Sequence, residues 1–133
     1  MIVVVDVANV LGSRPDGWWR DRAGAAARLL DRLAPLPGSD VSGPGGDRVS
    51  IDRLIAVVEG AARSVPPASG AVELVRADRD GDSAIVALAA DLVSDPAVAG
   101  ELLVVTADRA LRQRLSPTVH AVGPNWLNRL IGR

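Results

Sequence analysis

The sequence opens with MIVVVDVANVLG (residues 1–12), in which an apolar run at 2–5 leads directly into Asp6. A short β-branched run without alternation of apolar and polar residues is typical of a strand buried on both faces, and it predicts a strand over 2–6. Asp6 then stands at the end of this strand, with Asn9 three positions later in a glycine-containing turn. Because Val-Ala-Asn begins no obvious helix, Asp6 is better explained as a ligand than as a helix cap.

Composition narrows the class of protein. The chain has 133 residues, of which 48% are apolar, enough for one domain with its own core. It has no cysteine, which excludes disulfides, thiolate metal sites and cysteine nucleophiles. All its cations except one histidine are arginines, so Schiff-base chemistry and a phosphate-loop lysine are excluded as well. No apolar run is long enough to span a membrane, and we therefore expect a cytoplasmic protein without membrane contacts.

The first half of the chain predicts two helices separated by a loop. Pro15-Asp16-Gly17 opens the first helix, with Asp16 as the N-cap. A Pro- and Gly-rich loop follows at about 35–49. Ser50 then caps a second helix over 51–62, in which apolar residues recur at 3.6 spacing.

The second half alternates strands with helices. Strands are predicted over 71–75, 101–105 and 118–122, each followed by a helical segment. This alternation predicts a single α/β domain over 1–133, with three α/β/α layers around a mostly parallel sheet of about four strands. In such sheets, ligands bind outside the carboxyl ends of the strands.

Three of the four predicted strands deliver carboxylates to that edge. Asp6 ends the first strand, Asp82 follows the second, and Asp108 follows the third. Carboxylates brought together repel one another, and a hard cation offsets this cost, so all-oxygen groups favour Mg²⁺ or Mn²⁺. The alternative for Asp82 and for Asp108, taken singly, is an N-cap at the start of a helix. For Asp78 and Asp80, the alternative interpretation is that they are solvated residues of the loop.

Competing motifs fit less well. DRDGDS (residues 78–83) resembles a calcium loop, but its glycine falls too early and the twelfth position is Ala89. An aspartyl-phosphate enzyme needs a second acid two residues after the first, where this chain has Ala8. A serine triad has only His120 available, in the middle of a predicted strand, where a packed or edge residue is the simpler interpretation.

Three segments together resemble the NYN domains of the PIN-like nuclease superfamily. They are VVVDVANVLG (3–12), GDSAIVALAAD (81–91) and LLVVTADRALRQRL (102–115), with DxxN at the first strand end and TxD at the third. The resemblance extends over most of the chain. It implies a compact α/β/α fold whose strand-end acids bind Mg²⁺ or Mn²⁺ and activate water to cut RNA, and in some branches DNA.

Carried over position by position, the resemblance makes Asp6, Asp82 and Asp108 the metal-binding catalytic acids. Asn9 is the amide beside the first of them. Many members have an additional acid, for which Glu59, Asp52 and Asp80 are candidates here. An ion pair of Glu59 with Arg63 one helical turn away is the alternative.

The same resemblance places substrate-binding residues around these acids. Arg14 and Arg109 lie in or beside the metal motifs and are the candidates for phosphate contacts. Trp18 and Trp19 either stack on bases or anchor the core, since few other aromatic residues are available.

The function expected from these features is that of a metal-dependent ribonuclease acting on RNA. The net charge of −1 supplies no overall basic field, which leaves open a second hypothesis, an NYN module that binds RNA without cutting it. A phosphohydrolase of small nucleotides ranks last, because the chain has no glycine followed by a glutamate-rich helix. The oligomeric state, monomer or homodimer, stays open.

Overall fold

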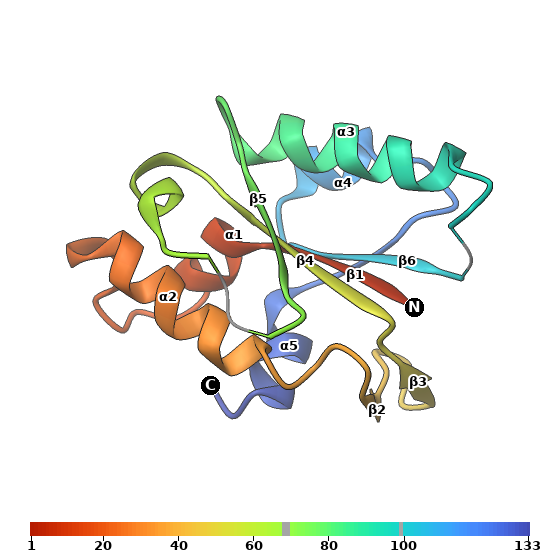
Figure 1. Cartoon of the computed structure of the whole chain (residues 1–133), viewed down its shortest axis with the longest axis horizontal. Helices are drawn as coiled ribbons and strands as arrows, with labels where there is room; N and C mark the ends of the chain where they lie inside the picture. Colours follow the sequence, from red (N-terminus) through yellow and green to blue (C-terminus); the bar gives the residue numbers. More distant parts are fainter. Residues whose placement is uncertain (68–69, 99) are drawn as a thin grey trace.

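A five-stranded parallel sheet forms the centre of the molecule in the computed structural model, which describes residues 1–67, 70–98 and 100–133 (Figure 1). The strand order is β5-β4-β1-β6-β7, and each neighbouring pair is parallel. The order reverses at β1, because the chain first adds strands on one side of it and then on the other. The strands are β1 (Ile2–Asp6), β4 (Arg53–Val58), β5 (Glu73–Arg76), β6 (Leu102–Val105) and β7 (His120–Val122).

Helices cover both faces of this sheet (Figure 1). One face packs against α1 (Val7–Gly12), α2 (Arg22–Leu33) and α5 (Pro124–Leu130). The other packs against α3 (Gly81–Ser94) and α4 (Arg109–Arg114). The expected three-layer α/β/α class is confirmed, with five strands in the sheet rather than about four.

The apolar run of β1 is buried on both faces, as its composition predicted. Val3 and Val5 face the layer of α1, α2 and α5, whereas Ile2 and Val4 face α3 and α4. Alternation along the strand therefore places Asp6 on the face covered by α3 and α4. Thr106, which follows β6, has the same parity as Leu102 and Val104 on that face.

The first predicted helix begins later than expected. Asp16 is exposed and bonded to Arg133, and it caps no helix. A short 3₁₀ turn, η1 (Trp18–Arg20), precedes α2, whose N-cap is Asp21. The side chain of Asp21 accepts a hydrogen bond from the Gly24 amide at 2.9 Å, which satisfies one of the free donors at the start of α2.

The segment predicted as a loop at 35–49 contains a small hairpin. Its strands β2 (Asp40–Ser42) and β3 (Arg48–Ser50) pair antiparallel around a glycine-rich turn. The indole of Trp126 in α5 donates a hydrogen bond to the carbonyl of Ser42 at 2.9 Å, which fastens the hairpin to the rest of the molecule.

The helix predicted over 51–62 is wrong, because this segment forms the strand β4 and the 3₁₀ turn η2 (Gly60–Ser64). Its apolar residues fit a 3.6-residue period, but residues 54–58 (LIAVV) are also an unbroken apolar run. A short run of this kind fits a strand buried on both faces equally well. Pairing with β1 on one side and β5 on the other selects the strand.

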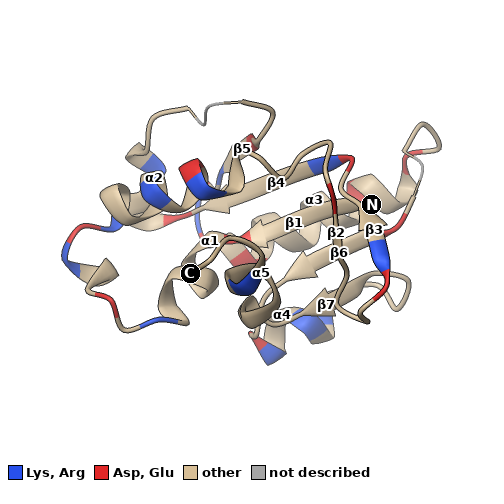
Figure 2. Ribbon diagram, turned by 90° about the horizontal axis from the view of Figure 1, so that it is seen from below, with Lys and Arg blue, Asp and Glu red and all other residues tan. Residues whose placement is uncertain are grey.

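Acidic and basic residues are interspersed along the ribbon in the view of Figure 2. None of the helices in the described part of the chain is long and apolar enough to cross a membrane.

Candidate active site at the carboxyl edge of the sheet

The carboxyl ends of β1, β4 and β6 lie side by side, because these strands are adjacent and parallel. Asp6 is the last residue of β1, Glu59 follows β4, and Thr106 follows β6. The helices α1 and α4 begin immediately beyond two of these strand ends. The edge thus combines strand-end side chains with helix N-termini, whose amide groups favour negative charge.

Asp6 is buried, with only 4% of its surface exposed, and both of its carboxylate oxygens have partners. Oδ1 accepts a hydrogen bond from the backbone amide of Asn9 at 3.3 Å, and Oδ2 accepts one from the Thr106 hydroxyl at 2.9 Å. The expectation that no helix starts here was wrong, since Asp6 is the N-cap of α1. Burial raises the pKa of Asp6 above its usual value, and the charges of Glu59 and Asp108 add to this effect, whereas the two hydrogen bonds oppose it.

Asn9 and Thr106 join the ends of β1 and β6. The Asn9 side-chain oxygen accepts a hydrogen bond from the Ala107 amide at 2.8 Å. The Thr106 hydroxyl, besides donating to Asp6, accepts a hydrogen bond from the Asp108 amide at 3.1 Å. The DxxN and TxD motifs therefore form one hydrogen-bonded unit that fixes Asp6 and Asp108 relative to each other.

Two residues of this unit were missed in the sequence. Thr106 stands inside the TxD motif and could have been found there. Arg112 carried no signal of its own, yet its guanidinium donates to the Thr106 carbonyl from Nε at 3.0 Å and from a terminal nitrogen at 2.8 Å. This pair of bonds stiffens the turn between β6 and α4, on which Asp108 lies.

Asp82 and Asp108 approach Asp6 from the starts of two helices. Asp108 caps α4 by accepting a hydrogen bond from the Leu111 amide at 3.1 Å, as its alternative interpretation allowed. Asp82 lies in the first turn of α3, where the cap is Asp80 instead. Partial burial raises the pKa of Asp82 to about 6, and the nearby carboxylates of Asp108, Asp6 and Glu59 contribute to the rise. The three predicted acids are thus close enough to act on one another's charge.

Glu59 is the additional acid that reaches this cluster. Its Oε2 accepts a hydrogen bond from the Gly81 amide at 2.6 Å, at the N-terminus of α3. The alternative partner, Arg63, is not among the ion pairs of the described residues, and the helix assumed for that pairing is absent. Glu59 raises the pKa of both Asp6 and Asp82, which places its charge at the site.

The other two candidates for an additional acid have structural roles. Asp52 lies at the opposite end of β4 from Glu59 and binds the amino group of Met1 at 2.5 Å. Asp80 is exposed and caps α3 by accepting a hydrogen bond from the Ser83 amide at 2.7 Å.

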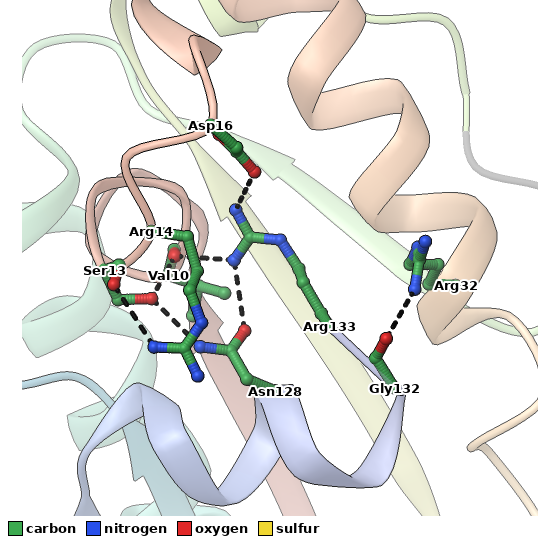
Figure 3. A network of polar contacts seen from close by, with 8 residues as sticks. All are labelled: Val10, Ser13, Arg14, Asp16, Arg32, Asn128, Gly132 and Arg133. Carbon is green, nitrogen blue, oxygen red and sulfur yellow. Dashed lines mark hydrogen bonds and ion pairs between the residues drawn. The ribbon is translucent and has the colours of Figure 1, made fainter.

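The two predicted phosphate-binding arginines differ in their surroundings. Arg14 contacts the Ser13 carbonyl at 3.4 Å and the Asn125 side chain at 3.3 Å, beside a network that ties α1 to α5 (Figure 3). Its guanidinium is therefore engaged by groups outside the acid cluster. Arg109 is exposed, follows Asp108 directly, and begins α4 at the same edge.

The chemistry of the donor set fits a hard divalent cation. The ion pairs of the described residues involve Asp52, Glu73 and Asp16, so none neutralises the cluster of Asp6, Glu59, Asp82 and Asp108. As the side chains stand, no three His, Cys, Asp or Glu residues in 1–67, 70–98 and 100–133 form a group that could hold a metal ion. Mg²⁺ is commonly bound by one or two carboxylates, with water and substrate phosphate completing its shell, so a smaller set is sufficient.

Comparison with known proteins identifies a shared fold. No protein-family model matches the chain, and no curated protein sequence does either. Among solved structures, Rae1 (YacP) from Bacillus subtilis matches with a TM-score of 0.65 over 99% of this chain and 74% of its own. A point mutant of that protein matches with a TM-score of 0.67 over 98% of this chain and 74% of its own. Sequence identity is 20% in both cases, and at this level the likeness establishes that the chain has the fold of Rae1.

Proposed function

We propose that this chain is a ribonuclease of the NYN type that hydrolyses RNA phosphodiester bonds with Mg²⁺ or Mn²⁺ held by Asp6, Asp82 and Asp108. The observation that carries the proposal is the cluster of four carboxylates at the carboxyl edge of the sheet, in which the pKa values of Asp6 and Asp82 are raised and no carboxylate has an arginine partner among the described residues. The motif resemblance and the fold shared with Rae1 support it.

Each residue of the cluster has a distinct part in this proposal. Asp82 and Asp108, which are half-buried, would hold the cation together with the buried Asp6. A cation bound here would lower the pKa of a bound water and shield the charge that gathers on the phosphate oxygens. Thr106 and Asn9 fix the position of Asp6 and of the β6–α4 turn, and Arg109 is placed to contact a phosphate.

A cleavage assay tests the proposal. Single-stranded RNA incubated with the protein should be cut with Mn²⁺ or Mg²⁺ and stay intact with EDTA. Asp82→Asn should lower the rate by at least about 100-fold, because it removes a cation ligand and keeps the size of the side chain. Asp78→Asn is the matched control, since Asp78 is exposed in the loop that precedes α3 and lies outside the cluster. Cleavage that persists in EDTA or in the Asp82→Asn variant would contradict the proposal.

A second function, RNA binding without cleavage, is favoured by one observation. Both oxygens of Asp6 already accept hydrogen bonds, from Asn9 and Thr106, so this carboxylate serves the fold as it stands. If RNA binds with salt-dependent affinity while cleavage stays at background with both cations, this second function is the correct one.

A further inference from the structure

A cavity of about 380 Å³ lies beside the acid cluster. Trp18 lines it from η1 and Arg22 from the first turn of α2, and Glu59 and Gly60 line it just beyond β4. Arg79 and Asp80, just before α3, also line it. Since Glu59 belongs to both the cavity and the acid cluster, the two sites adjoin.

The aromatic wall of the cavity is held in place by its neighbours. Trp18 is half-buried, packs against the core and lies close to Gly12 at the end of α1. Trp19 meets it edge-on, with the ring centroids 6.1 Å apart and the planes at 88°. Asp21 caps α2 directly after these residues, so the segment is anchored to a helix and not to an unsupported loop.

Arginines accompany both indole rings. The Arg22 guanidinium lies 5.3 Å from the centre of the Trp18 ring, and that of Arg20 lies 5.9 Å from the Trp19 ring. In the described part of the chain, neither Arg22 nor Arg79 forms an ion pair with a carboxylate. Trp19 is 50% exposed, which is unusual for so large an apolar side chain and extends the aromatic surface beyond the cavity.

We infer that this cavity binds an unpaired nucleotide of single-stranded RNA, with the base against Trp18 and the adjoining phosphates on Arg22 and Arg79. The inference rests on the proposed function and names the subsite that presents the strand to the acids. Stacking on aromatic rings combined with arginines along the backbone is the general way in which proteins hold single strands. The cavity volume lies at the lower end of the range for small-molecule sites, which suits one nucleotide and not a duplex.

The overall charge of the protein makes this local site necessary. With a net charge of −1 and charges of both signs interspersed along the ribbon (Figure 2), long-range attraction supplies little affinity for RNA. The acid cluster itself repels phosphate. A strand that reaches the acids must therefore be held by a neighbouring group of aromatic and cationic side chains.

Binding measured in EDTA tests the inference without interference from cleavage. A fluorescein-labelled single-stranded RNA of about ten nucleotides is titrated with the protein, and anisotropy gives the Kd. Trp18→Ala should weaken binding about tenfold, and Trp18→Phe should retain most of it, because an aromatic face remains. Trp126→Phe should bind as the wild type does, since Trp126 is buried against Ser42 away from the cavity.

The arginine contacts are tested through salt dependence. Arg22→Ala should weaken binding and reduce the slope of log K against log salt by about 0.7, the value for one phosphate contact on a single strand. Arg28→Ala is the matched control, because Arg28 is an exposed arginine of the same helix that lies outside the cavity. Unchanged urea midpoints establish that the variants are folded.

The outcomes separate this inference from the proposed function. Wild-type affinity in both Trp18→Ala and Arg22→Ala, or tighter binding of duplex than of single-stranded RNA, would overturn the inference even if the protein cuts RNA. Binding that depends on Trp18 and Arg22 would uphold it even if no cleavage occurs with Mn²⁺ or Mg²⁺, in which case only the catalytic proposal fails.

Discussion

Thr106 shows how a single hydroxyl serves both the fold and the site. It is fully buried, donates to Asp6 Oδ2 at 2.9 Å and accepts from the Asp108 amide at 3.1 Å. Both acids are held by this one group, which lies 100 residues from Asp6 in the chain although β1 and β6 are adjacent in the sheet. Its removal should therefore disturb the position of two acids at once.

The first prediction concerns Thr106→Val, which keeps the shape of the side chain and removes the hydroxyl. We expect the free energy of unfolding to fall by about 1–3 kcal/mol, because a buried carboxylate oxygen and a backbone amide lose their partner. Urea denaturation at pH 7 measures the change. Thr106→Ser retains the hydroxyl and should recover most of the free energy of unfolding that the valine variant loses with these hydrogen bonds. A valine variant as stable as the wild type would show that the hydrogen bonds contribute nothing to stability.

The second prediction follows from the raised pKa of Asp82, about 6 in the folded protein against an ordinary value of 3.8. Between these two values the folded state binds more protons than the unfolded state, so this residue lowers stability as pH rises from about 4 to 6. Because Asp82 is partly exposed, solvent screening reduces the effect, and Asp82→Asn should stabilise the protein at pH 7 in EDTA by about 1 kcal/mol. Unfolding curves at pH 4 and pH 7 test this, and an equal effect at both values would contradict it.

At the scale of the elements, the sequence predicted strands correctly where the composition of an apolar run and the spacing of its residues both indicate a strand. The strand at β1 has its predicted bounds, and those at β5, β6 and β7 begin one or two residues later than predicted. The prediction failed at β4, where the same apolar residues fit the 3.6-residue period of a helix and also a strand buried on both faces. Only pairing with the neighbouring strands β1 and β5 selects the strand. The hairpin β2–β3 was missed because its strands have three residues each, too few for a pattern.

The candidate site was predictable to the extent that it lies at strand ends. Asp6, Asp82 and Asp108 were found because parallel strands bring their carboxyl ends together. Glu59 was considered as a residue of a predicted helix that the structure does not contain. It reaches the site from the end of β4 instead. Arg112 could not be found, because its role depends on a side chain folding back onto the turn that precedes its own helix.

The third prediction concerns the attachment of α5 to α1. The Arg133 guanidinium donates to the Val10 carbonyl at 2.8 Å and to the Asn128 side chain at 3.0 Å, and it pairs with Asp16 at 3.2 Å (Figure 3). Arg133→Ala should lower the free energy of unfolding by about 2 kcal/mol, because charge-assisted bonds to partly buried acceptors are lost. Arg129→Ala, an exposed arginine of α5, is the matched control. Equal urea midpoints for the two variants would show that the network does not stabilise the contact between α1 and α5.

At the scale of the whole molecule, the parallel sheet brings together acidic residues that lie far apart in the sequence. Four carboxylates from β1, β4, α3 and α4 meet at one edge, although the chain as a whole is nearly neutral. The hydrogen bonds of Asp6, Asp108 and Glu59 to backbone amides offset part of the repulsion. What remains is repulsion among these four carboxylates, and a ligand that removes it should stabilise the folded state.

The fourth prediction is therefore a stabilisation by divalent cations that depends on the cluster. Mn²⁺ at about 100 times its dissociation constant should add about 2.7 kcal/mol and raise the Tm by several degrees relative to EDTA, if it binds the folded state alone. Asp82→Asn should start from a higher Tm in EDTA, because the repulsion is relieved, and should respond little to Mn²⁺. Asp52→Asn should respond as the wild type does, since Asp52 lies at the opposite end of β4. A Tm that does not change with Mn²⁺ in the wild type would show that amide hydrogen bonds and solvent alone balance the cluster, and the protein would then be better described by the non-catalytic function.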